Sequence, residues 1–251
     1  MLTNNKIKLL KSLDQKKVRR ELGLFLVEGE KMVKELLESR FEIEEIFALQ
    51  QYIDELDYKG DVEITAVNQK DLERISMLKT PNKVVAIAKI PQIDDAAKIN
   101  NGLSIALENV QDPGNLGTIV RTAAWFGIKN VYCSPETVDI YNPKVIQSTM
   151  GAIFKVNVQY CDLALLAEKA KKFGVTLYGT RLDGESIYNT DLKKDAIIFM
   201  GNESKGMTTK LSQMMSENLK IPSYANADND MESLNVSIAT AIVCAEFRRR
   251  N

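Results

Sequence analysis

The sequence contains no histidine, and this absence narrows the chemistry that the protein can perform. Without imidazole, proton transfer near neutral pH must use a carboxylate, an amine, a phenol, a thiol or a group of the substrate. Zinc sites that contain histidine are excluded as well. The cysteines Cys133, Cys161 and Cys244 are scattered and odd in number, so they predict neither a metal cluster nor a disulfide framework. We therefore expect a metal-free protein of the reducing cytoplasm.

Long apolar stretches and glycine-rich nucleotide signatures are missing too. No run approaches the ~18–20 apolar residues of a membrane span, and residues 1–17 lack the apolar core of a signal peptide. No G-x-G-x-x-G occurs, and G-N-E-S-K-G at 201–206 continues with Met207 instead of ending as a Walker A motif. These absences count against one hypothesis, an ordinary nucleotide-binding enzyme of small metabolites.

What is present is ordinary for a globular protein: 251 residues, of which 45% are hydrophobic and 27% are charged. The formal net charge is −1, but residues 1–34 carry nine Lys or Arg against four Asp or Glu. This excess is either a solvated helix face or a patch that binds a phosphate backbone. On the second interpretation the candidate RNA contacts are Lys16, Lys17, Arg19 and Arg20.

Hydrophobic periodicity predicts two regions of α/β class, joined by a polar linker at 91–101. In the first region, 1–92, the pattern predicts an α/β/α unit with helices at 4–22, 30–39 and 69–76 and strands at 24–29, 43–49, 61–67 and 83–90. In the second region, 100–251, the pattern predicts strands at 103–109, 130–133, 155–159, 175–179, 196–200 and 219–221. They alternate with helices at 115–126, 143–151, 163–173, 207–216 and 233–249. Such alternation predicts a parallel sheet with helices on both faces, whose ligands bind at the carboxyl ends of the strands.

The loop after strand 103–109 leads into a predicted helix that carries one arginine among apolar residues. The turn at 112–114 is followed by Asn115, which can cap the next helix, and by Arg121 among apolar residues. A buried, unpaired charge is expensive. Arg121 therefore either forms a salt bridge with an acid at a strand end, or faces a phosphate or a developing oxyanion.

Two further strand ends carry polar loops. The glycines of 201–206 suit a close approach of the backbone to a ligand. After strand 219–221, the residues Ser233, Leu234 and Asn235 open a helix that is apolar on almost every side, which predicts burial. The first turn of that helix offers free backbone N–H donors. Ser233 is a plain N-cap, a member of the site, or both.

In this order and spacing, the three loops resemble the three motifs of the SpoU (TrmH-like) branch of the SPOUT RNA methyltransferases. The matching letters are N-x-G-x-x-x-R at 115–121, G-N-E-S-K-G at 201–206 and I-P…S-L-N-V-S at 221–237. Residues 17–37 are similar to the small ribosomal-protein-like substrate-binding domain of that family. The resemblance, which covers nearly the whole chain, implies that residues 1–92 bind RNA and that 100–251 form a parallel-sheet domain with a deep trefoil knot. It also implies a homodimer with its active site at the interface.

The activity implied by the resemblance is methylation of a ribose 2′-hydroxyl in structured RNA by S-adenosylmethionine. The ribosomal-protein-like domain favours rRNA over tRNA as the substrate. Arg121 would be the central catalytic residue. The residues that would support it are Asn115, Glu203, Ser233 and Asn235. The residues that would contact the cofactor are Thr180, Gly201, Ile221 and Leu234.

This chemistry suits a chain without histidine or metal. Methyl transfer from a sulfonium is an in-line displacement, and positioning the hydroxyl against the methyl carbon lowers most of the barrier. Arginine keeps its proton at ordinary pH, so Arg121 is better suited to stabilising the alkoxide and the adjacent phosphate than to acting as a base. The proton can pass to an RNA phosphate or, as a second choice, to Glu203.

One stretch departs from the family pattern. Residues 223–232 form a loop longer than we expect in relatives, and it carries Asp228, Asp230 and Glu232. The loop acts as a lid, or it hinders access of the cofactor. Two alternatives to an rRNA methyltransferase therefore stay open: a tRNA 2′-O-methyltransferase, and a catalytically silent protein of RNA binding or ribosome assembly.

Overall fold

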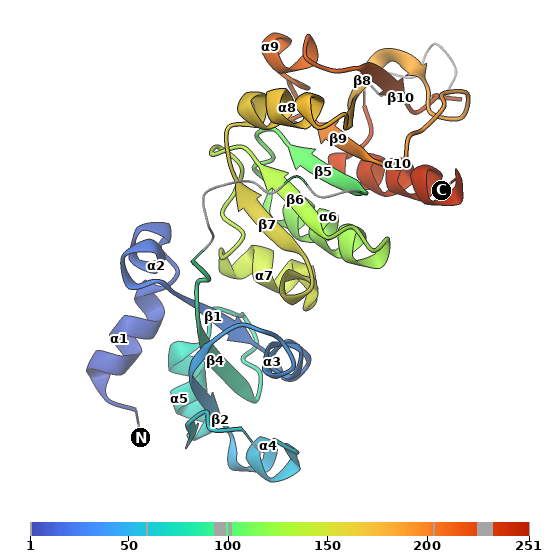
Figure 1. Ribbon diagram of the computed structural model, residues 1–251. Helices are drawn as coiled ribbons and strands as arrows, with labels where there is room; N and C mark the ends of the chain where they lie inside the picture. The colour runs from blue at the N-terminus through green and yellow to red at the C-terminus, as the bar shows by residue number, and fades with distance from the viewer. Residues whose placement is uncertain are drawn as a thin grey trace. The chain divides into compact units, whose positions relative to one another are not determined.

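The computed structural model describes residues 2–58, 60–92, 99, 102–202, 204–224 and 233–250 (Figure 1). By their internal contacts the residues divide into two units, 1–93 with 139–154 and 94–138 with 155–251. The domains predicted from the sequence, 1–92 and 100–251, remain a prediction. The contact-based units differ from them in assigning 139–154 to the first unit.

The first unit contains a mixed sheet of order β1-β4-β2-β3. Its strands are β1 (Leu24–Glu28), β2 (Ile43–Ala48), β3 (Ile64–Ala66) and β4 (Val84–Lys89). β4 pairs antiparallel with β1 and β2, and β2 pairs parallel with β3. Its helices are α1 (Asn4–Ser12), α2 (Lys16–Leu22), α3 (Glu30–Leu37), α4 (Gln50–Glu55), α5 (Gln69–Ile75), α7 (Pro143–Thr149) and the 3₁₀ turn η1 (Ala152–Phe154).

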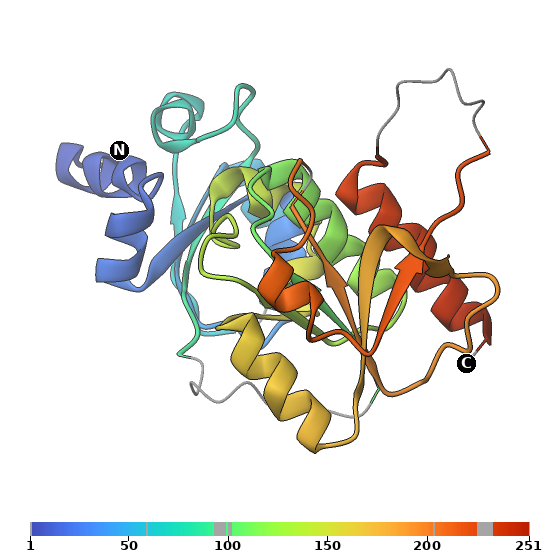
Figure 2. The same ribbon diagram turned by 90° about the horizontal axis from the view of Figure 1, so that it is seen from above.

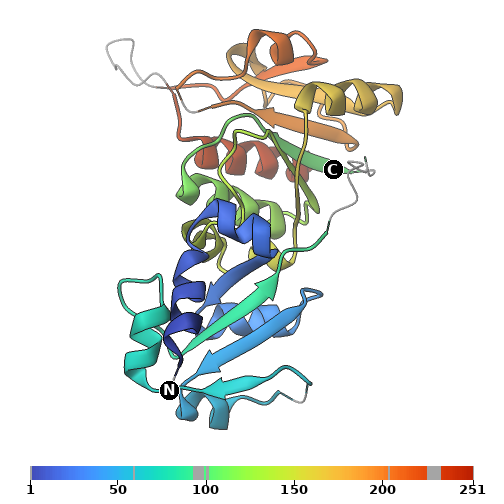
Figure 3. The ribbon, with the colours of Figure 1, turned by 90° about the vertical axis from the view of Figure 1, so that its left-hand side faces the viewer.

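Helices cover both faces of this sheet, as the sequence predicts. On one face α1 and α5 bury Leu10 and Leu72 in a cluster with Leu26, Phe47 and Val85 of the strands. In Figure 3, α1 (dark blue) lies in front of these strands. On the other face α3 packs against β1 and β4. The strands are therefore buried on both sides, which explains their nearly continuous apolar runs.

The helices of this unit differ from the prediction in two places. The single helix expected at 4–22 is two helices, because the chain turns at 13–15 between α1 and α2. The carbonyls of Leu13 and Asp14 in that turn accept hydrogen bonds from the Arg19 side chain, at 2.9 and 2.7 Å. A side chain of the following helix thus satisfies carbonyls at the end of α1, and no glycine or proline marks the break in the sequence. The short helix α4 was also not predicted.

The second unit contains a sheet of order β10-β8-β9-β5-β6-β7, in which every pairing is parallel. The strands are β5 (Leu103–Leu107), β6 (Asn130–Cys133), β7 (Asn157–Tyr160), β8 (Thr176–Ser186), β9 (Ala196–Met200) and β10 (Glu217–Lys220). The helices are α6 (Pro113–Trp125), α8 (Leu163–Lys172), α9 (Thr209–Ser212) and α10 (Val236–Arg250). The fold class predicted from the sequence is confirmed, and only α9 is much shorter than expected.

The two faces of this sheet have different helices. α8 and α9 pack on one face through Leu166, Ala170 and Leu211, against strand residues such as Leu177 and Phe199. On the other face the rings of Tyr178 and Phe247 meet edge to face, 5.3 Å apart, which places α10 there. α6 and α10 lie side by side on that face (Figures 1 and 3). Among the described residues, no helix is both long and apolar enough to cross a membrane.

Candidate active site

A cleft of about 870 Å³ opens in the second unit, where β9 and β10 end and where the pairing of β8 with β9 stops at Gly179. Five residues singled out in the sequence line it together: Thr180, Gly201, Ile221, Ser233 and Leu234. They come from four separate segments of the chain. The carboxyl ends of β9 and β10, the middle of β8 and the approach to α10 therefore converge on one site, close to the place expected for an open α/β sheet.

An irregularity in β8 forms one wall of the cleft. The pairing of β8 with β10 jumps from Gly179 opposite Asn218 to Glu185 opposite Leu219, so residues 180–184 have no register partner in β10. Figure 2 shows the edge of the sheet where β8 and β10 lie side by side. Bulges of this kind redirect side chains, and here residues 180–183 line the cleft. The sequence predicted the end of the strand at 179 but not its continuation to Ser186.

Gly201 is where two segments of the backbone pass closest. A Cβ atom at this residue would lie 2.3 Å from the carbonyl carbon of Gly206 and 2.3 Å from the nitrogen of Met207. Ordinary carbon contacts are ~3.5–4.0 Å, so no side chain fits. The requirement for glycine here is steric and confirms that the loop at 201–206 closes tightly on itself.

The loop at 201–206 is held against the turn that precedes α6. The side-chain amide of Asn202 donates to the carbonyl oxygen of Asn109 at 2.9 Å. Asn109 has a φ of 58°, a left-handed conformation that costs energy for a residue other than glycine. The Glu108 carboxylate accepts from the backbone N–H and the hydroxyl of Thr208, both at 2.7 Å. Two of the three predicted loops are therefore joined by side-chain hydrogen bonds.

The first turn of α6 is capped differently from the prediction. The side chain of Asp112 accepts a hydrogen bond from the backbone N–H of Asn115 at 2.8 Å, so Asp112 and not Asn115 is the N-cap. The Asn115 side chain is therefore not the cap of this helix. Its Oδ1 accepts a hydrogen bond from Nδ2 of Asn235 at 2.9 Å. The first and third motifs thus meet directly through two predicted site residues.

Asn235 also begins α10. Its Oδ1 accepts hydrogen bonds from the backbone N–H and the hydroxyl of Ser237, at 2.9 and 2.6 Å. The interpretation of Ser233 as an N-cap is therefore wrong, because the helix begins three residues later, at Val236. Ser233 lies at the cleft instead.

Arg121 is exposed on α6 and does not line the cleft of its own chain. It has no ion pair or hydrogen bond with another described residue, so the strand-end salt bridge that the sequence allowed is absent within the described part of the chain. Exposed residues of α6 recur at helical spacing: Gly114, Thr118, Arg121 and Trp125. The charge therefore avoids the cost of burial by facing outward.

Of the four basic residues predicted to bind RNA, Arg19 is placed differently from the others. It is only 1% exposed, and its Nε donates to Asp139 Oδ2 at 3.1 Å, while Nη2 bonds the same oxygen. Because Nη1 donates to two carbonyls as well, all three nitrogens of the guanidinium are bonded within the protein. The prediction that Arg19 contacts RNA is therefore wrong. Lys17 and Arg20 are exposed and Lys16 is partly exposed.

Two predicted elements lie outside the described residues. One is Glu203, and the other is the part of the acidic loop at 225–232, with Asp228, Asp230 and Glu232. Their roles stay predictions.

The three thiols are poor candidates for proton transfer. Burial raises the pKa of the Cys133 thiol, raises that of Cys244 to about 12, and raises that of Cys161 to about 11. A thiol must ionise to act as a base or nucleophile. All three therefore stay protonated near neutral pH. No group of three or more His, Cys, Asp or Glu side chains that could hold a metal occurs among the described residues.

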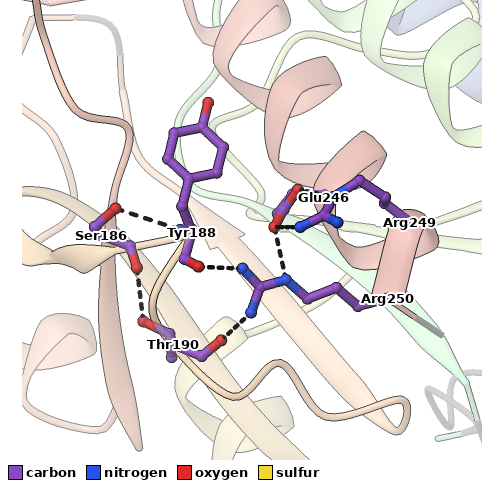
Figure 4. A network of polar contacts seen from close by, with 6 residues as sticks. All are labelled: Ser186, Tyr188, Thr190, Glu246, Arg249 and Arg250. Carbon is purple, nitrogen blue, oxygen red and sulfur yellow. Dashed lines mark hydrogen bonds and ion pairs between the residues drawn. The ribbon is translucent and has the colours of Figure 1, made fainter.

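The arginines at the end of α10 contact the protein itself. Arg248 Nε donates to the carbonyl oxygen of Phe126 at 2.7 Å, at the C-terminus of α6, where a cation is favourable. Figure 4 shows Arg250 between the Glu246 carboxylate and the carbonyl oxygens of Tyr188 and Thr190. Hydrogen bonds from Arg249 and Arg250 lower the pKa of Glu246 to about 2. These contacts fix the last turn of α10 to the loop that follows β8.

Four charged residues of the cleft were not singled out in the sequence: Arg181, Asp183, Lys205 and Lys220. The rule that ligands bind at strand ends could have identified Arg181 and Lys220, since each lies within two residues of the end of a predicted strand. The bulge that turns Arg181 into the cleft carries no sequence signal that we identified.

Comparison with known proteins agrees with the motifs. Residues 102–245 match the model of the SpoU rRNA Methylase family, and residues 4–86 match that of the MRM3-like substrate binding domain. A curated relative is the 23S rRNA (guanosine(2553)-2′-O)-methyltransferase RlmP of Bacillus subtilis, which is 31% identical over 98% of this chain and 96% of its own.

Two solved structures are similar over the full length of the chain. One is a putative RNA methyltransferase of the TrmH family from Porphyromonas gingivalis, with 35% identity, a TM-score of 0.91 and complete coverage of both chains. Another is an AdoMet-bound rRNA methyltransferase from Sinorhizobium meliloti, with 29% identity, a TM-score of 0.84 and coverage of 100% of this chain and 96% of its own. With these matches and the three assembled motifs, the chain belongs to the SpoU rRNA methylase family.

Proposed function

We propose that the protein transfers a methyl group from S-adenosylmethionine to a ribose 2′-hydroxyl of ribosomal RNA. The observation that carries this proposal is the convergence of Thr180, Gly201, Ile221 and Leu234 on one cleft at the strand ends. Membership of the SpoU family supports it, as does the relative named as a 23S rRNA 2′-O-methyltransferase.

The residues of the cleft fit this cofactor. Leu219, Ile221, Leu234 and Val236 supply apolar surface for an adenine ring, and Gly201 lets the backbone of Gly206 and Met207 pass close at the edge of the cleft. A volume of about 870 Å³ is within the usual range of ligand pockets. S-adenosylmethionine supplies an electrophilic methyl group when bound. Thr180, Gly201, Ile221 and Leu234 are therefore its proposed contacts.

Arg121 acts from a second copy of the chain in this proposal. It is exposed, unpaired among the described residues and absent from the cleft of its own chain. On the same helix Trp125 is 86% exposed, and Ile238 of the neighbouring α10 is 51% exposed. Exposed apolar side chains on adjacent helices favour an interface, and a two-fold dimer would give each cleft an arginine from the other copy.

In the proposed mechanism these residues position groups more than they exchange protons. Asn115 and Asn235 hold the start of α6 against the start of α10, and Ser233 lines the cleft. Arg121 stabilises the negative charge that develops on the 2′-oxygen and orients the neighbouring phosphate. The hydroxyl proton passes to an RNA phosphate or, as the second choice, to Glu203.

The first unit is the proposed RNA-binding part. Its match to the MRM3-like substrate binding domain, together with the relative named as a 23S rRNA methyltransferase, supports rRNA over tRNA. The exposed basic residues of α2 are its proposed contacts, without Arg19. The deep trefoil knot of the family is likewise part of the proposal for the second unit. Three free cysteines and an RNA substrate support action in the cytoplasm.

Subunit mixing tests the placement of Arg121. Arg121→Ala and Gly201→Ala proteins, each inactive alone, are unfolded, mixed equally and refolded together. If one chain's Arg121 completes the other's cleft, half of the dimers hold one intact site, and about one quarter of wild-type activity returns. If both groups act within one chain, no activity returns.

Substrate class is tested with total RNA from a strain that lacks the protein. The RNA is incubated with labelled S-adenosylmethionine and then separated by size. The proposal predicts label in one large rRNA band. Label in the tRNA fraction would overturn the choice of substrate, and absence of label together with no calorimetric binding of the cofactor would indicate a silent RNA-binding protein.

A further inference from the structure

The bulged segment of β8 presents an arginine to the cleft in a fixed orientation. Nε and Nη2 of Arg181 donate to the two carboxylate oxygens of Asp183, at 2.7 and 2.9 Å, and Nη1 bonds the hydroxyl of Ser212. Ser212, the last residue of α9, is buried. Partners on two elements therefore hold the guanidinium, although its side chain is 41% exposed.

This arrangement leaves hydrogen-bonding capacity unused. A guanidinium has five N–H donors, and the three contacts of Arg181 leave one N–H on each terminal nitrogen. Two N–H groups at the end of a planar fork match two oxygens of a phosphate or a carboxylate. Since its orientation is already fixed, Arg181 loses little further side-chain freedom when it binds an anion.

The surrounding charge favours an anion as well. Lys205 and Lys220 line the same cleft and have no ion pair with a described residue, whereas Asp183 is the only described acid in its lining. Arg181 and then Lys220 lower the pKa of Asp183, which shows that Lys220 lies within electrostatic reach of the pair. The described lining thus carries three cations and one carboxylate, although the chain as a whole has a net charge of −1.

We propose that Arg181, with Lys220, binds a backbone phosphate of the RNA substrate. This inference rests on the proposed function and names a further RNA contact for it, at the cleft itself. S-adenosylmethionine carries an ammonium and a sulfonium against one carboxylate, so a cluster of cations opposes its net charge. An RNA strand carries a negative charge at every nucleotide. A phosphate fixed here places the target ribose beside the cofactor residues Thr180 and Gly201.

The experiment compares Arg181→Gln and Lys220→Gln with Lys172→Gln, a control that removes an exposed lysine of α8 outside the cleft. Each protein is assayed for methyl transfer to an unmodified 23S rRNA transcript and for direct RNA binding at several salt concentrations. Calorimetry gives the Kd for S-adenosylmethionine. Thermal unfolding checks that each variant is folded, and Lys220→Gln keeps the test decisive if Arg181→Gln is unstable.

For both cleft variants we expect RNA to bind about tenfold more weakly. The slope of log affinity against log salt should fall by about 0.7–0.9. The Kd for S-adenosylmethionine should match that of Lys172→Gln. Weaker cofactor binding with unchanged RNA affinity would overturn the proposal, because the anion would then be the carboxylate of the cofactor.

The proposal would also be overturned if the two cleft variants matched Lys172→Gln in RNA affinity and in its salt dependence. A wild-type protein that transfers no methyl group, while Arg181→Gln still loses RNA affinity, would refute the proposed function and support the phosphate site. The two failures are therefore separable.

Discussion

Replacing Gly201 with alanine tests how the loop at 201–206 builds the cleft. The added Cβ would lie 2.3 Å from two backbone atoms, at Gly206 and Met207. Because ordinary carbon contacts are ~3.5–4.0 Å, the two segments must separate by roughly 1 Å or more. The φ angle of Gly201 is not in the left-handed region, so the cost is steric, and overpacking of this kind typically costs about 1–3 kcal/mol.

The consequence for function should exceed the consequence for stability. Gly201 and Gly206 both line the cleft, and a displacement of ~1 Å at a reacting site can cost on the order of 100-fold in rate. We expect urea unfolding to report a loss of about 1–3 kcal/mol. Calorimetry should show binding of S-adenosylmethionine weakened by at least about tenfold, since the displaced loop carries cofactor contacts.

A second glycine offers a matched control. Gly174 follows α8 with a φ of +73°, and a Cβ there would meet nothing within 4 Å. Alanine at 174 should cost ~1–2 kcal/mol through its backbone conformation and leave cofactor affinity unchanged. Wild-type cofactor affinity in Gly201→Ala, or an equal loss in Gly174→Ala, would refute the reasoning.

Three further predictions concern charged residues that lie outside the cleft. Asp139→Asn should lower the free energy of unfolding by about 3 kcal/mol, because it leaves the buried Arg19 without its carboxylate; urea unfolding measures this, and a loss below ~1 kcal/mol would contradict it. The Glu246 carboxylate, whose pKa its arginine partners lower to about 2 from an ordinary 4.5, should stabilise the fold above about pH 4.5, with this contribution lost as the pH falls towards 2. Glu246→Gln should therefore lose stability at pH 6 and little at pH 2, and an equal loss at both would contradict the assignment. A triple variant that replaces Lys16, Lys17 and Arg20 of α2 should weaken RNA binding and flatten its salt dependence. Its cofactor affinity should be unchanged, which serves as the control. Unaltered RNA binding in that triple variant would restore the interpretation of a solvated helix face.

Much of the fold was predictable because local pattern and tertiary structure agree. Each predicted strand overlaps a strand of the structure, since strands buried on both sides leave short apolar runs bounded by polar turns. The parallel sheet followed from the alternation of strands and helices. The cleft followed from the rule that ligands bind at strand ends, and the family motifs identified which loops to examine.

What sequence reasoning missed depends on contacts between distant residues. Arg19 looks like the basic residues around it, and only its partner Asp139, 120 positions away, makes it a buried structural arginine. Asp112 and Asn115 are both good helix caps, so the choice between them required coordinates. The bulge at 180–184 arises from the register of β10 against β8, which no local pattern records.

The most direct test of the account is the chemical identity of the product and its dependence on Arg121. Wild-type protein and Arg121→Ala are incubated with an unmodified 23S rRNA transcript and labelled S-adenosylmethionine, and the RNA is then digested and its nucleosides are separated. The account predicts label on a ribose 2′-oxygen, in a dinucleotide that resists alkaline hydrolysis. It also predicts a loss of about 100-fold or more in rate for Arg121→Ala, with cofactor affinity retained. Label on a base, or full activity without Arg121, would contradict it.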